Sequence, residues 1–171
     1  MKIAFYKASS KPLPARIWSK LIAGYTAGPY SHCELVFDDG NFFPLSLNVL
    51  VQNPRGPGDL CFSSSEQDGG TRFKLIPLQP KHWDIVKMPE LYLDEAMDWC
   101  EKHDSLRYDW RGLRGFVFPW EKPDPKDLFC SECVIECCQD QGLLTQLVAG
   151  KTSPNDLARA VGLLKPEGIR A

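Results

Sequence analysis

The stretch FCSECVIECCQDQ, residues 129–141, predicts the helix around which the fold is organised. At 100° per residue, one stripe of this helix carries Cys130, Cys133, Val134, Cys137 and Gln141, and the opposite side carries Ser131, Glu132, Ile135, Glu136 and Gln139. We expect the cysteine stripe to face the protein interior, because a buried thiol packs as a small apolar group. Cys130 differs from Cys133 and Cys137 because it lies in the first turn, where free backbone N–H groups and the helix dipole favour a thiolate. Cys130 is therefore the candidate nucleophile.

A thiol nucleophile needs a base, and His32 is the best-placed histidine for that role. It lies near the start of the segment SHCELVF, residues 31–37, which alternates in the manner of a half-buried strand. One face of this strand carries Cys33, Leu35 and Phe37, and the other carries His32, Glu34 and Val36. The other two histidines, His82 and His103, fall in a loop and in the polar end of a helix, where we expect solvated or structural roles.

The rest of the chain predicts an α+β fold with an antiparallel sheet. Apolar or alternating runs bounded by turn residues predict strands at residues 2–6, 31–37, 60–65 and 71–76. Helical spacing and capping residues predict helices at residues 14–23, 89–103 and 129–141, and a last helix after an N-cap at Ser153. Residues 41–59 carry weak signals and are expected to form a surface excursion. No repeat or change of composition divides the chain, so we expect residues 1–171 to form a single domain.

The composition is that of an ordinary globular chain. The 171 residues include 20 Lys and Arg against 22 Asp and Glu, which argues against a nucleic-acid partner recognised by bulk positive charge. No apolar run is long enough to span a membrane, and the first residues lack the apolar stretch of a secretion signal. The seven cysteines do not have the spacing of a disulfide framework, so we expect free thiols and a reducing, cytoplasmic environment.

Four segments occur in a distinctive order: YSHCELV (residues 30–36), the pair Tyr108-Asp109, FCSECV (residues 129–134) and SPNDL (residues 153–157). Together they resemble the circularly permuted branch of the NlpC-type papain-like superfamily, which includes the YiiX-like and the lecithin retinol acyltransferase-like proteins. In that branch the histidine strand precedes the cysteine helix, as His32 precedes Cys130 here. The resemblance covers residues 1 to about 161 apart from much of 41–59, which looks like an insertion.

The resemblance implies a permuted papain-like fold, with an antiparallel sheet or partly open barrel packed against the helix that begins at the catalytic cysteine. It makes Cys130 the nucleophile and His32 the general base. Its third, orienting residue lies on the strand after the histidine strand, where Ser63 is the best match to a position that is often a carboxylate. A hydroxyl does not stabilise imidazolium as a carboxylate does, so Glu34 is an alternative, and a Cys-His dyad is another.

The activity implied is that of a cysteine-dependent hydrolase or acyltransferase that attacks an amide, isopeptide or ester bond through an acyl-enzyme. Peptide, isopeptide and lipid-ester substrates all fit, and neither a metal nor an organic cofactor is required. The alternative from a different class is a non-catalytic papain-like module that serves in binding or as part of a virion.

The aromatic and glycine-rich segment at residues 108–120 is expected to border the site, because it precedes the proline-rich approach to Cys130. Its candidate substrate-binding residues are Tyr108, Asp109, Trp110, Arg111 and Arg114. The same mixture of aromatic and basic residues would suit a polyanion, and the spacing of Cys130 and Cys133 would suit a metal. We favour neither, because packing over the site explains the aromatic residues and because a continuous helix without a second C-x-x-C is a poor metal knuckle.

Overall fold

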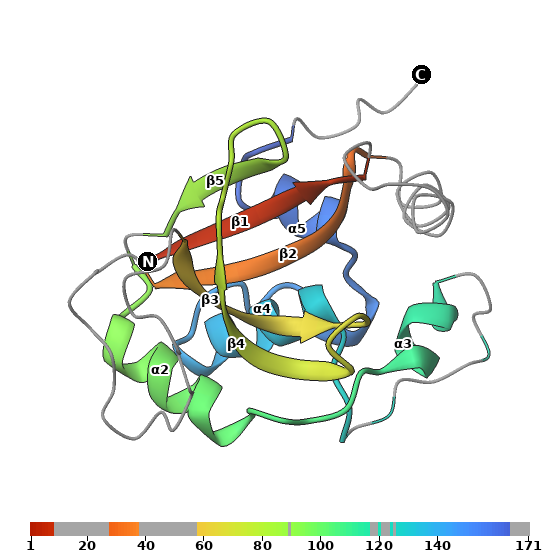
Figure 1. Cartoon of the computed structure of the whole chain (residues 1–171). Coiled ribbons are helices and arrows are strands. Elements are labelled where there is room, and N and C mark those ends of the chain that lie inside the picture. The colour runs from red at the N-terminus through yellow and green to blue at the C-terminus, as the bar shows by residue number, and fades with distance from the viewer. Residues whose placement is uncertain are drawn as a thin grey trace.

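The computed structural model describes residues 1–8, 28–37, 58–88, 90–116, 120, 124 and 126–164. The helix predicted at residues 14–23 and nearly all of the excursion predicted at residues 41–59 lie outside these described residues. The described elements form two layers, a sheet and a set of helices that pack mainly on one of its faces (Figure 1).

A five-stranded sheet forms the first layer, in the order β4-β3-β2-β1-β5 and with every pairing antiparallel. Its strands are β1 (Lys2–Lys7), β2 (Tyr30–Phe37), β3 (Asp59–Ser65), β4 (Gly70–Ile76) and β5 (Trp83–Lys87). The first four strands and the α+β class with an antiparallel sheet confirm the sequence-based prediction. β5 was not predicted, because its five residues are too few for a clear alternation, and its extended form depends on pairing with β1.

The described helices are α2 (Leu93–Lys102), α3 (Trp110–Gly115), α4 (Cys130–Asp140) and α5 (Pro154–Ala160), with a short 3-10 helix, η2 (Ala149–Lys151), before α5. α4 agrees with its prediction to one residue at each end, and the predicted cap of α5 is confirmed, since the Ser153 hydroxyl accepts the Asp156 N–H at 3.1 Å. α2 begins four residues later than predicted, and α3 lies within the aromatic segment at residues 108–120, where no helix was predicted.

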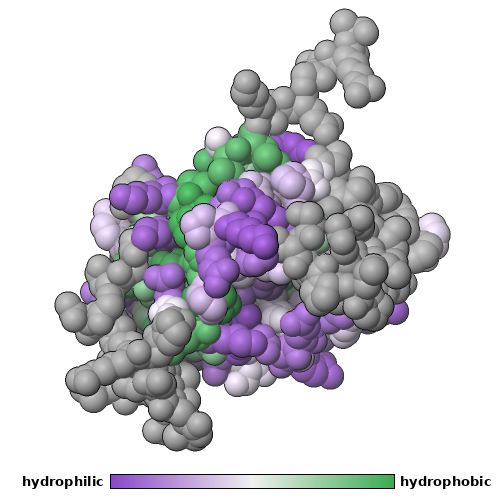
Figure 2. Space-filling model, turned by 45° about the horizontal axis from the view of Figure 1, so that its top comes forward, coloured by the Kyte–Doolittle hydropathy of each residue, from purple (hydrophilic) through white to green (hydrophobic). Residues whose placement is uncertain are grey.

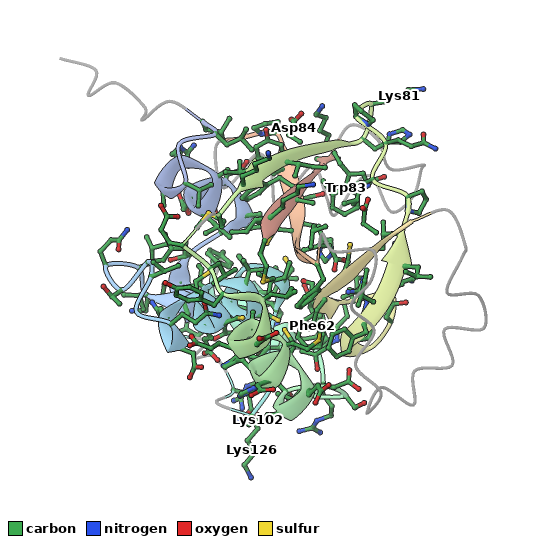
Figure 3. All side chains as sticks on the ribbon, turned by 90° about the vertical axis from the view of Figure 1, so that its left-hand side faces the viewer. Phe62, Lys81, Trp83, Asp84, Lys102 and Lys126 are labelled. Atoms are coloured by element: carbon green, nitrogen blue, oxygen red, sulfur yellow. The ribbon has the colours of Figure 1, made fainter. Side chains whose placement is uncertain are left out.

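Strand alternation gives the sheet two apolar faces. The face toward the helices carries Phe5, Leu35, Phe62 and Phe73 of the main core, and the far face carries Ala4, Val36, Cys61 and Trp83 of a smaller cluster. Figure 3 shows this division, with Phe62 between the sheet and α2, and Trp83 on the other side of the strands. His32 and Glu34 alternate with Cys33 and Leu35 on β2, so they belong to the side of the smaller cluster.

Helix α4 is buried on more sides than its sequence predicts. Its cysteine stripe is buried as expected, but so are Ser131, Glu132 and Ile135, which the helical pattern placed opposite. The cause is the segment before α5, which covers this side of the helix; the Ser131 hydroxyl donates to the Thr152 carbonyl at 2.7 Å. A helix in the middle of a core needs no polar face, so its periodicity is a poor guide to its orientation.

Most apolar side chains of the described residues lie in these two clusters. On the face shown in Figure 2, hydrophobic residues form a band flanked by hydrophilic ones. Of the residues that the structure describes, the large hydrophobic ones that remain exposed are Ile85, Tyr92, Trp110, Trp120 and Val148. Among the described helices, none combines the length and the apolar character that a membrane crossing requires.

A buried amide connects α5 to the start of β2. The Asn155 side chain accepts the Tyr30 N–H and donates to the Tyr30 carbonyl, both at 2.9 Å, and it is fully buried. Gly28 permits this approach, because a Cβ at that position would overlap the Asn155 side chain. The contact fixes the strand end two residues before His32.

We predict that Asn155→Ala lowers the free energy of unfolding by about 3 kcal/mol, because it leaves a buried N–H and a buried carbonyl unpaired. Gln141 is a matched control, since its amide makes the same two bonds to the backbone of Tyr92 at an exposed site. Gln141→Ala should cost less than about 1 kcal/mol, because water replaces the lost bonds. Urea unfolding followed by tryptophan fluorescence measures both; equal losses would contradict the role given to burial.

Candidate active site

Cys130 is the first residue of α4, and several backbone bonds hold it there. The Leu128 carbonyl accepts bonds from the Ser64 hydroxyl and the Asp109 N–H, and the Leu128 N–H donates to the Arg107 carbonyl at 3.2 Å. The Glu132 carboxyl accepts the N–H of Phe129, the residue before Cys130, at 3.3 Å. Cys130 as a whole residue is only 5% exposed. The start of the helix is therefore anchored to β3 and to the segment before α3, as a fixed nucleophile requires.

Strands β2 and β3 separate beside Cys130. They pair only from Leu35–Phe62 to Phe37–Leu60, so the edge of β2 near Cys33 has no strand partner. The Ser63 hydroxyl donates to the Cys33 carbonyl across this gap at 2.7 Å, and the Cys33 N–H interacts with Cys130. The gap explains how a thiol from the helix layer meets His32, which belongs to the far face of the sheet.

The third residue is where the structure departs from the first choice made from sequence. Ser63 was the best sequence match, but its hydroxyl is bonded to the Cys33 carbonyl. Glu34, the alternative, accepts a bond from His32 Nε2 to its Oε1 at 2.7 Å. The physical reason is that Glu34 shares a strand face with His32, whereas Ser63 satisfies a carbonyl left free where the strands part.

The bond to Glu34 occupies His32 Nε2 and leaves Nδ1 as the ring nitrogen available to Cys130, which interacts with the imidazole and raises its pKa. Aromatic side chains flank the ring: Trp83 stands edge-on to His32 at 6.4 Å between ring centroids, and Tyr6 lies opposite His32 on β1 and edge-on to Trp83. Trp83 is buried in the far-face cluster. These contacts hold the imidazole in one orientation and limit the access of water to its bond with Glu34.

The charges at the site favour a thiolate beside an imidazolium. Hydrogen bonding from the Cys33 thiol lowers the pKa of Cys130 most; burial opposes this, and the charge and hydrogen bond of His32 lower it further. Burial alone would lower the pKa of His32, but Cys130 and Glu34 raise it to about 9. The two shifts act in opposite directions, and both favour the thiolate–imidazolium pair over the neutral thiol and imidazole.

Arg72, on β4, completes the charged group and was not found by sequence reasoning. Its guanidinium donates to both oxygens of Glu34, at 2.7 and 2.9 Å. Burial would raise the pKa of Glu34, but bonds from His32 and Arg72 lower it below its ordinary value. The only signal in the sequence was a basic residue at a partly buried position of an alternating strand, and it does not say which carboxylate the residue meets.

The predicted substrate-binding residues differ in their burial and in their partners. Burial raises the pKa of the Tyr108 phenol most, and the charge of Cys130 adds to this. Trp110 is half-exposed and stands edge-on to Tyr108 at 5.1 Å. Asp109 is buried and caps α3, accepting the N–H groups of Arg111 and Gly112 at 2.9 and 2.8 Å, so its carboxylate is taken up by backbone rather than offered to a ligand.

Arg111 and Arg114 lie on α3, where both side chains are exposed. α3 lies at the side of the molecule toward which the start of α4 points (Figure 1). Their contact with an anionic substrate group stays a prediction.

Other acidic and thiol groups of α4 have raised pKa values, unlike Cys130. Burial raises the pKa of Glu132 to about 8, so its carboxyl is largely neutral at pH 7 and adds little negative charge beside the thiolate. Burial also raises the pKa of the Cys133 thiol. Within the described part of the chain, no three His, Cys, Asp or Glu side chains are grouped to hold a metal ion.

No family model, curated protein or solved structure matches this chain. The candidate site therefore rests on the residues themselves and on their geometry.

We predict that iodoacetamide alkylates Cys130 at pH 6 at least about 100-fold faster than Cys33, Cys61, Cys100, Cys133 or Cys138, whose thiols burial holds protonated. The rate at Cys130 should also stay nearly flat from pH 6 to 8.5, since the thiolate is already formed, whereas an ordinary thiol gains about tenfold per pH unit. Peptide mass spectrometry after timed alkylation reads each site. A steep pH dependence at Cys130 would contradict the ion pair.

Proposed function

We propose that this protein is a cysteine-dependent hydrolase or acyltransferase that acts on an amide, isopeptide or ester bond. The observation that carries the proposal is the continuous chain from the Cys130 thiol through His32 to Glu34, with the thiol at a helix start. A nucleophile, a base and a group that orients the base are the three parts of nucleophilic acyl transfer. A structural cysteine would need none of them.

In the proposed reaction the Cys130 thiolate attacks the carbonyl carbon of the substrate, and the carbonyl π electrons move to the oxygen. The tetrahedral intermediate then collapses, and the imidazolium of His32 gives its Nδ1 proton to the leaving amine or alcohol. Neutral His32 next takes a proton from water, or from an acceptor alcohol or amine, which attacks the thioester and releases Cys130. Glu34 remains ionised and holds Nε2 throughout.

The oxyanion needs donors near the thiol. The backbone N–H of Cys130 is at the helix start, where such groups have no partner within the helix. Tyr108 is a second candidate, because burial and the charge of Cys130 keep its phenol protonated and hence able to donate. Both groups point to acyl chemistry, in which a carbonyl oxygen becomes negative.

The order of the elements supports a permuted papain-like architecture for this activity. The histidine strand β2 comes early in the chain and the cysteine helix α4 late, and the two meet beside an antiparallel sheet. The SPNDL segment has a place in this arrangement as well, since its Asn155 fixes the start of the histidine strand. Peptides, isopeptides and lipid esters remain the substrate classes that the chemistry admits.

The decisive variant is Cys130→Ala. With a panel of a p-nitrophenyl ester, a peptidyl aminocoumarin amide and an isopeptide-linked peptide, we expect turnover to fall at least about 1000-fold, because the covalent step is lost. Cys133→Ala is the matched control on the same helix face and should retain activity while costing about 1 kcal/mol of stability. Intact-mass spectrometry of the wild-type protein should detect the acyl group on Cys130. Normal folding with no acylation of Cys130 by any substrate would favour the non-catalytic alternative.

The pH dependence should separate amide from ester substrates. Above about pH 9 imidazolium loses its proton, so acylation by an amide should fall, because the leaving amine needs that proton. Acylation by the p-nitrophenyl ester should persist, because nitrophenolate leaves without one. Single-turnover rates between pH 6 and 10.5 measure the difference; parallel profiles for the two substrates would remove His32 from the role of acid.

A further inference from the structure

We infer that Arg72 is a positioning residue of the proposed site, which acts through Glu34 to hold His32 in the orientation and charge state that Cys130 needs. The inference rests on the proposed function, and it assigns a role to a residue of β4 that touches neither the thiol nor a substrate. Asp68, in the turn between β3 and β4, supports Arg72 in this role.

Hydrogen bonds from Arg72 and His32 hold the Glu34 carboxylate in place. Arg72 Nη2 donates to Oε1 at 2.7 Å and Nη1 donates to Oε2 at 2.9 Å, which is the two-pronged arrangement that only arginine makes. Oε1 also accepts His32 Nε2 at 2.7 Å. The position of this shared oxygen, and hence the direction of the imidazole, is therefore set from the side of β4.

Arg72 is itself held by two further bonds. Its Nε donates to Asp68 at 2.7 Å, and its Nη1 donates to the Ser63 carbonyl at 3.1 Å. Ser63 faces Arg72 across the β3–β4 ladder and binds the Cys33 carbonyl with its hydroxyl. The guanidinium thus spans the gap between β2 and β3 that admits Cys130.

The charges show why the site needs this residue. Glu34 is 0% exposed, and a buried carboxylate without a permanent cation takes up a proton or forces one onto a neighbour. The charged groups that bind it are His32 on β2 and Arg72 on β4; Cys130 on α4 interacts with His32, and Asp68, beside Arg72, is also paired with Lys74. The Cys33 and Cys61 thiols, on β2 and β3, are buried and have raised pKa values, so they stay neutral. With Arg72 present, the thiolate and the carboxylate are balanced by the imidazolium and the guanidinium. Without it, one buried negative charge is in excess, and protonation of Glu34 or Cys130 relieves it.

The alternative is that Arg72 serves only to stabilise the fold. A purely structural residue would change the stability of the protein but not the protonation of Cys130 in the folded fraction. The two roles therefore differ in the pH profile of thiol alkylation, which needs no substrate. A protein without turnover and a protein in which Arg72 is purely structural would therefore give different results.

The test compares Arg72→Met, Arg72→Lys, Glu34→Gln and the double variant Arg72→Met with Glu34→Gln, measuring the rate of Cys130 alkylation from pH 4 to 9. We expect Arg72→Met to lower the rate at pH 6 about tenfold or more, which requires the pKa of the Cys130 thiol to rise to about one unit above the pH of the assay. Arg72→Lys keeps the positive charge but not the two-pronged hydrogen bonding, so its alkylation rate at pH 6 should be close to that of the wild type. Arg107→Met is the matched control, because Arg107 forms an exposed ion pair with Asp127.

The double variant protects the test against unfolding, since it removes the buried charge together with its partner. If Arg72 acts through Glu34, adding Arg72→Met to Glu34→Gln should change alkylation by less than about twofold, because the two effects are not additive. With an active substrate, Arg72→Met should lower kcat at unchanged KM. A wild-type alkylation profile in folded Arg72→Met would overturn the inference, even if Cys130→Ala had abolished turnover. Absence of turnover with every substrate, together with the expected alkylation profiles, would overturn the proposed function alone.

Discussion

The burial of one carboxylate, that of Glu34, is the constraint on which the candidate site depends. An ionised carboxylate removed from water is stable only if cations and hydrogen-bond donors surround it. Arg72 and His32 supply them from two different strands, and burial of the same region by Trp83 keeps their bonds free of competing water. The orientation of His32 and the charge of Cys130 both follow from this arrangement, since the imidazole has one nitrogen committed to the carboxylate and the other free for the thiol.

The break in strand pairing is the second condition. A regular sheet would have placed His32 and Cys130 on opposite sides of an unbroken layer of backbone. Because β2 and β3 part beyond Leu35, the helix start reaches the open edge of β2, and the polar groups exposed there are satisfied by Ser63 and by the thiol. The irregularity that costs the sheet its ladder bonds is thus the feature that assembles the site.

Several parts of the fold could be predicted because their signals are local. The α4 boundaries and the cap at Ser153 follow from helix spacing and capping chemistry, and the strand at β2 follows from its alternation. β5 and α3 could not be predicted in this way, since they are short and their form depends on β1 and on the buried cap at Asp109. The prediction that only the cysteine side of α4 is buried was wrong in part, because the segment before α5 packs against the opposite side.

The sequence by itself determined the helix that carries Cys130 at its first turn, the strand that carries His32, and the pair of possible orienting residues. Only the tertiary structure decided that Glu34, and not Ser63, is bonded to His32, and that Arg72 binds this carboxylate. The physical reason is the range of the interactions. Helix and strand patterns depend on residues a few positions apart, whereas hydrogen bonds and ion pairs at the site join segments separated by tens of residues, whose approach is set by the register of the sheet and the packing of the core.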